Sequence, residues 1–152
     1  MKTLANSADK EEVLRRLNLM LPESRRRWGR MSAHQMLCHL SDAYLVTMGE
    51  MKVSPASGLL QRTFMKWVAL SVPLPWPHGI STRPEIEQGK GGTTPANFEL
   101  DRTRVIELTH RFTRTNRDFE WSEHAIFGPL DERQWMRWGY LHADHHLRQF
   151  GV

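Results

Sequence analysis

The stretch DERQWMRWGYLHADHHLRQF, Asp131–Phe150, decides how this chain folds. Asp131 followed by Gln134 is a capping-box pattern, in which each side chain bonds to the backbone N–H of the other residue, so we expect a helix to begin here. At about 100° per residue the apolar side chains gather along one side, as they do on a helix that packs against a core. The opposite side, expected to face solvent, carries Arg137, Asp144 and Arg148.

Two histidines of this helix, His142 and His146, stand four residues apart at the border of the apolar stripe. At this spacing two side chains share one face, with Cβ atoms about 5–6 Å apart, so both imidazoles can bind one ion. A divalent metal held by histidine nitrogens at about 2.1 Å needs at least one further ligand from elsewhere in the fold. His145 lies at the margin of this face and is set aside as a ligand.

The segment Ala33–Met48 offers that further ligand. Ser32 and Gln35 form another capping box before it, and the segment is apolar round most of its circumference, which predicts a helix at the centre of the core. His39 lies on the same face as its apolar residues, whereas His34 lies about 140° away. We therefore expect a metal site made by His39, His142 and His146.

Asp42 follows His39 by three residues and shares its face. It can act as a fourth ligand, as an acceptor for an imidazole N–H, or as a general base, and we take it as the candidate catalytic residue. Gln35 also lies on this face but has a competing role in the capping box. Cys38 lies about 100° away from His39, so we expect a small core residue rather than a ligand or nucleophile.

The remaining aromatic residues near the motif have two interpretations. Trp135 and Trp138 lie beside the histidine pair, where they either pack in the core or line a substrate cavity. Three other histidines lie outside the proposed constellation and are expected to be structural or exposed: His78, His110 and His124.

Three more segments are predicted to be helical from their apolar spacing: Asp9–Met20, Leu59–Val72 and Ala96–Thr115. Residues 73–95 and 116–130 are rich in proline, glycine or polar residues and are predicted to be long loops. No segment alternates long enough to build a sheet. We expect an all-α protein, an antiparallel four-helix bundle with a short extra helix and long loops, forming one domain over residues 1–152.

Composition limits the setting and the partners. The single Cys38 excludes an internal disulfide framework, which fits a reducing, cytoplasmic location. No apolar run is long enough to cross a membrane, so no membrane partner is expected. The net charge of the chain is +4. Its only dense basic cluster is Arg25–Arg27, which we expect to lie exposed to solvent on the surface. We therefore do not expect a nucleic-acid partner.

The segments QMLCHLSDA (35–43) and HADHHLRQF (142–150) resemble the DinB-like superfamily, the helical-bundle proteins also described as DinB/YfiT-type metalloenzymes. The resemblance extends over nearly the whole chain and is closest to a branch of unknown function. In the superfamily, one histidine of the second helix and a His-x-x-x-His pair of the last helix bind a divalent ion, which corresponds to His39, His142 and His146. Many members continue with Arg-Gly-Gln, where this chain has Leu147, Arg148 and Gln149.

The resemblance implies a three-histidine site with open positions for water or substrate. Some relatives are S-transferases or isomerases that use a low-molecular-weight thiol such as bacillithiol, mycothiol or glutathione. We expect a divalent metal ion, zinc or nickel, and a metal-dependent enzyme, such as a thiol-dependent S-transferase or a hydrolase, that acts on a small molecule. The alternative is a non-catalytic, metal-stabilised binding or stress-associated scaffold protein in which Asp42 completes the coordination. Apolar helix faces are also compatible with a homodimer.

Overall fold

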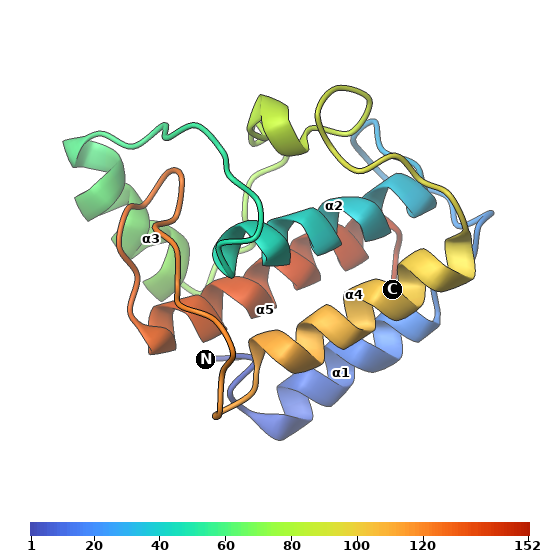
Figure 1. Ribbon diagram of the computed structural model, residues 1–152, viewed down its shortest axis with the longest axis horizontal. Coiled ribbons are helices and arrows are strands. Elements are labelled where there is room, and N and C mark those ends of the chain that lie inside the picture. Colours follow the sequence, from blue (N-terminus) through green and yellow to red (C-terminus); the bar gives the residue numbers. More distant parts are fainter.

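The computed structural model describes all residues 1–152 and contains helices but no strand, which confirms the all-α prediction (Figure 1). A π-helical turn, η1, spans Gln61–Met65, and a 3-10 turn, η2, spans Pro84–Ile86. The five α-helices are α1 (Ser7–Asn18), α2 (Ala33–Thr47), α3 (Lys66–Ser71), α4 (Phe98–Phe112) and α5 (Glu132–Gln149). No helix is both long and apolar enough to cross a membrane.

Both predicted capping boxes are formed. The Ser32 hydroxyl accepts a hydrogen bond from the Gln35 backbone N–H at 3.1 Å, and the Asp131 carboxylate accepts one from the Gln134 N–H at 2.7 Å. In each box the glutamine side chain returns a bond to the backbone N–H of the capping residue. Each box therefore fixes the residue at which its helix begins.

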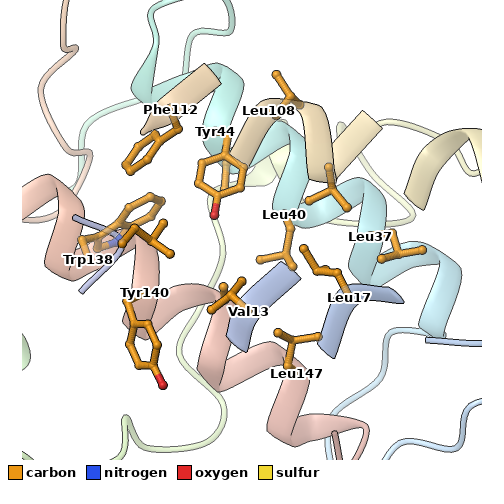
Figure 2. Close-up of a cluster of buried hydrophobic side chains, with 14 of the residues drawn as sticks. Val13, Leu17, Leu37, Leu40, Tyr44, Leu108, Phe112, Trp138, Tyr140 and Leu147 are labelled. Atoms are coloured by element: carbon orange, nitrogen blue, oxygen red, sulfur yellow. The ribbon is translucent and has the colours of Figure 1, made fainter. Parts of the chain in front are cut away.

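The core lies between α1, α2, α4 and α5 (Figure 1). α2 packs against α4 and α5, while α1 packs against α4 and α5. α2 is the central helix, since 12 of its 15 residues are buried. Figure 2 shows the side chains that meet there, among them Val13, Leu17, Leu37, Leu40, Leu108 and Leu147.

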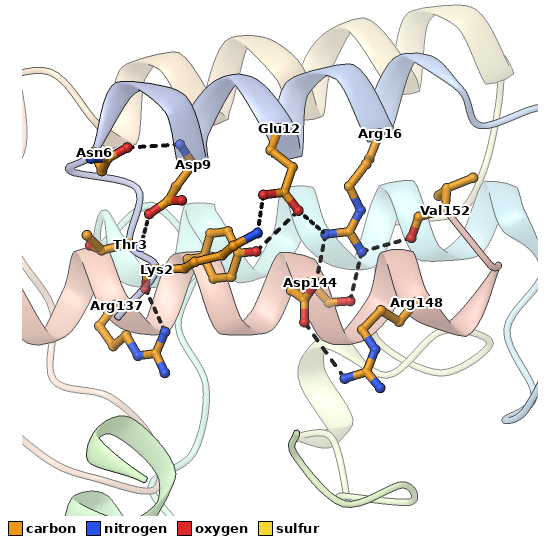
Figure 3. A network of polar contacts seen from close by, with 11 residues as sticks. Lys2, Thr3, Asn6, Asp9, Glu12, Arg16, Arg137, Asp144, Arg148 and Val152 are labelled. Carbon is orange, nitrogen blue, oxygen red and sulfur yellow. Dashed lines mark hydrogen bonds and ion pairs between the residues drawn. The ribbon is translucent and has the colours of Figure 1, made fainter. Parts of the chain in front are cut away.

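On the charged side of α5, Asp144 and Arg137 contact α1 and the N-terminal segment, contrary to the expectation that this side faces solvent, whereas Arg148 is exposed as expected (Figure 3). Asp144 accepts a hydrogen bond at 2.7 Å from the buried guanidinium of Arg16. Arg137 donates to the Lys2 carbonyl at 2.6 Å. Periodicity alone missed these contacts because a helix between two neighbours has no wholly solvated side.

The predicted helix Leu59–Val72 is only partly regular. Residues 61–65 form a π turn, and the α-helical part is the short α3. This segment packs against α5 at one edge of the molecule (Figure 1). The following loop passes over the site and reaches α2 through η2.

Candidate metal centre

The three histidines predicted as ligands meet between α2 and α5. Nε2 of His39 and Nε2 of His142 are 3.3 Å apart, and one nitrogen from each of His39, His142 and His146 lies within 4.8 Å of the others. A tetrahedral ion with metal–nitrogen bonds of about 2.1 Å requires ligand nitrogens about 3.4 Å apart. The group therefore fits a divalent ion with small side-chain adjustments.

Burial keeps all three imidazoles in the neutral form. The pKa of His39 is lowered mainly because its ring is buried. The pKa values of His142 and His146 lie well below the ordinary value, first because of burial and then because of the neighbouring imidazoles. A neutral imidazole has the lone pair that a metal needs. The donor set thus fits a metal centre.

Gln149 holds the ring of His146. Nδ1–H of His146 donates to Gln149 Oε1 at 3.2 Å, which leaves Nε2 for the three-histidine group. Gln149 is buried, and its Nε2 donates in turn to the Trp28 carbonyl at 2.8 Å. This chain of bonds fixes both the tautomer and the orientation of a candidate ligand, as second partners of metal-binding histidines commonly do. The residue lies three positions after His146, the spacing at which two helical side chains meet.

Asp42 is fully buried but does not belong to the group of candidate ligand atoms. Its carboxylate accepts hydrogen bonds from the Thr93 backbone N–H at 2.8 Å and from the Thr93 hydroxyl at 2.5 Å. Gln88 Nε2 lies 3.5 Å from the same carboxylate. These contacts join α2 to the 88–93 part of the long loop. The negative charge of Asp42 also raises the pKa of His39 and so partly opposes the lowering caused by burial.

A cavity of about 530 Å³ opens onto the three histidines. Its walls come from α2, α5, the η1–α3 segment and both long loops. Trp138 stacks on His142 with 4.8 Å between ring centroids, and both Trp135 and Trp138 contribute to the wall. Trp135 and Trp138 thus do both things that the sequence allowed: they pack in the core and they line the cavity. The walls are largely apolar, with the histidines as one polar wall.

Two histidines outside the ligand group also line this cavity, His124 and His145. The pKa of His124 is lowered to about 4 by burial, and its Nδ1 accepts hydrogen bonds from two backbone N–H groups of the 124–128 turn. His78 stacks on Trp28 with 4.0 Å between ring centroids. Helical periodicity could not place His124 or His78, because both lie in loops.

α2 carries another polar group, formed by His34, Cys38 and Asp101. His34 Nε2 and the Asp101 carboxylate are 2.7 Å apart and join α2 to α4. Burial, together with the nearby Asp101 charge, raises the pKa of the Cys38 thiol to about 12. Cys38 is buried in the core, in agreement with the prediction that it is a small core residue.

Comparison with curated proteins and with solved structures finds no match. One family model, described as "Protein of unknown function (DUF1569)", matches residues 2–151. The match covers nearly the whole chain, including α2, α5 and the loops that enclose the cavity. The chain therefore belongs to the DUF1569 family.

Proposed function

We propose that this protein binds one divalent metal ion through His39, His142 and His146 and is a metal-dependent enzyme of the DinB-like superfamily. The observation that carries the proposal is the convergence of three neutral imidazoles, two of them buried and that of His142 half-buried, at the wall of an apolar cavity. We further propose that α1, α2, α4 and α5 form the antiparallel four-helix bundle of that superfamily. Zinc or nickel is the proposed ion, because both accept imidazole ligands readily.

A bound metal would polarise a substrate or lower the pKa of a thiol or water in the cavity. The chain's own residues would set the geometry: Gln149 orients His146, and Trp138 supports His142 by stacking. The apolar walls favour a small, largely apolar substrate. Transfer of a low-molecular-weight thiol to such a substrate is the reaction that we propose from the resemblance to the superfamily.

The alternative is a non-catalytic protein in which the metal only joins α2 to α5. That proposal needs a fourth protein ligand, and Asp42 was the candidate. Both Asp42 oxygens accept hydrogen bonds from the long loop, so its contacts support a role in holding that loop over the cavity. The open cavity beside the histidines favours the enzyme.

Elemental analysis of protein purified without chelators tests the metal site. We expect about one divalent ion per chain, by the usual stoichiometry of such sites, and loss of the ion in His39→Ala with retention of helical structure. His110→Ala is the matched control, because His110 is an exposed α4 histidine outside the group. Metal-free wild-type protein whose unfolding temperature does not respond to Zn²⁺ or Ni²⁺ would contradict the proposal.

Substitution of the metal by Co²⁺ distinguishes the enzyme proposal from the non-catalytic alternative. In the enzyme, adding glutathione or bacillithiol to the Co²⁺ protein should produce a thiolate-to-cobalt absorption band, because a coordination position is open. Turnover of an electrophilic aromatic substrate should then depend on both metal and thiol. An unchanged spectrum, with four protein ligands by X-ray absorption, would support the scaffold instead.

A further inference from the structure

The η1–α3 segment and the loop after it concentrate the exposed apolar surface of the molecule. Of the 12 large hydrophobic residues that are exposed, eight lie within residues 59–80. They are Leu59, Leu60, Phe64, Met65, Trp67, Val68, Leu74 and Ile80. Isolated exposed hydrophobics are ordinary, but a contiguous group of this kind marks an interaction surface.

This segment is apolar on two sides. Met65, Val68 and Val72 line the cavity, at the spacing of one helical face. Leu60, Phe64 and Trp67 are 59%, 60% and 59% exposed, and the Phe64 and Trp67 rings lie next to each other with 6.3 Å between centroids. We call Leu59, Leu60, Phe64 and Trp67 the outer face. A helix face made of large apolar side chains is normally covered, and nothing in the chain covers the outer face.

The two charged side chains of the helical segment 59–72, Arg62 and Lys66, are both basic. Residues 51–84 contain Lys52, Arg62, Lys66 and Arg83, while Glu50 and Glu85 border this stretch and Glu85 accepts a hydrogen bond from the Ser54 N–H. Glu123, which lies 3.6 Å from Arg62, forms the only ion pair that these four cations make. The outer face therefore combines leucine and aromatic side chains with two basic side chains, of which Lys66 donates to the Pro129 carbonyl and has no acidic partner.

We propose that the outer face docks onto an anionic lipid surface. Leucine, phenylalanine and tryptophan beside lysine and arginine are the composition of helices that lie in the membrane interface. A second copy of the chain fits less well, because a two-fold contact packs this segment against the same segment of the other copy, which carries Arg62 and Lys66 but no acidic residue. Arg62 and Lys66 would then face like charges without acidic partners from this segment. The expectation of no membrane partner rested on the lack of a spanning segment, which a surface contact does not need.

Docking would also bring the cavity to the lipid surface. Phe64, Met65 and Val68 are exposed and at the same time line the cavity. The edge of the cavity is thus part of the surface that contacts the lipid. The binding itself depends on neither the metal nor catalysis, so its failure and the failure of the proposed function are separate results.

Vesicle flotation tests the proposal with the full chain. We expect binding to phosphatidylcholine vesicles that contain phosphatidylglycerol, and little binding to pure phosphatidylcholine. The double variant Leu60→Ser/Trp67→Ser should lose binding, whereas Leu100→Ser, which changes a 69% exposed leucine on α4, should not. Lys66→Glu should weaken binding roughly 25-fold, since each basic residue near an anionic surface contributes about fivefold and the change also adds a negative charge. Arg104→Glu on α4, which makes no contact with η1 or α3, is the charge control, and circular dichroism checks that each variant is folded.

Three results would overturn the proposal. Binding that survives Leu60→Ser/Trp67→Ser but is lost in Arg25→Gln/Arg26→Gln would assign the lipid contact to the basic cluster near the N-terminus. Absence of binding to vesicles of either composition would exclude the lipid surface. Light scattering that reveals a dimer, dissociated by Leu60→Ser/Trp67→Ser, would assign the outer face to a second copy of the chain.

Discussion

Replacing Gln149 by leucine should weaken both the fold and the proposed metal site. The amide of Gln149 accepts from His146 at 3.2 Å and donates to the Trp28 carbonyl at 2.8 Å, and its side chain is buried. Leucine fills a similar volume but leaves both partners without a hydrogen bond. Each unpaired buried polar group costs about 1–3 kcal/mol, so we expect the free energy of unfolding to fall by about 2–5 kcal/mol. Loss of an orienting partner also lowers metal affinity by about 10–100-fold.

Gln149→Glu is the matched variant that separates the two effects. Its carboxylate still accepts from His146 but no longer donates to Trp28, so stability should fall while metal affinity is retained. Urea unfolding of the metal-free protein measures the first quantity, and competition with a chromophoric zinc chelator measures the second. If Gln149→Leu binds zinc within a factor of about two of wild type, the proposed orientation of His146 by Gln149 is wrong, because the expected loss is at least about tenfold.

Three further predictions concern stability. The Asp42 carboxylate accepts hydrogen bonds from both donors of Thr93, whereas in Asp42→Asn only one oxygen can still accept. Hydrogen exchange at the Thr93 amide should therefore accelerate while the metal content is unchanged. Loss of the metal would instead make Asp42 part of the metal centre. Asp144→Ala removes the 2.7 Å partner of buried Arg16 and should lower the unfolding free energy by about 1–3 kcal/mol in urea titrations, with Asp144→Asn intermediate. Burial lowers the pKa of His124 to about 4 in the folded protein, whereas in the unfolded chain it is near 6.5. Between these values only the unfolded chain binds the proton. The free energy of unfolding should therefore be highest above about pH 6.5 and fall as the pH drops toward 4. His124→Asn should reduce this slope by up to about 1.4 kcal/mol per pH unit, and an unchanged slope would contradict the burial argument.

Periodicity predicted the regular helices and the histidine faces well. Both capping boxes begin their helices at the expected residues, and α2 is central because its apolar residues encircle it. The same reasoning predicted a regular helix over residues 59–72, where the structure has a π turn and then a short α-helix. It also placed Asp144 in solvent, because a helical wheel describes one helix and not the neighbour that covers it.

The sequence by itself determined the helical class and the three residues that can share an ion. Spacing of four residues puts His142 and His146 on one helix face, and this relation is local, so it holds in any fold that keeps the helix. The distance of 3.3 Å between the Nε2 atoms of His39 and His142 is not local. It depends on how α2 packs against α5 across more than a hundred intervening residues.

Only the tertiary structure decided what surrounds the histidines. The tie from His146 through Gln149 to Trp28, the contact of Asp42 with Thr93, and the cavity wall made by the long loops all join segments far apart in sequence. Loop residues have no periodic pattern from which their neighbours can be inferred, because their positions follow from packing and hydrogen bonding to the finished core. For that reason the candidate ligands could be read from the sequence, while the cavity and the outer face could not.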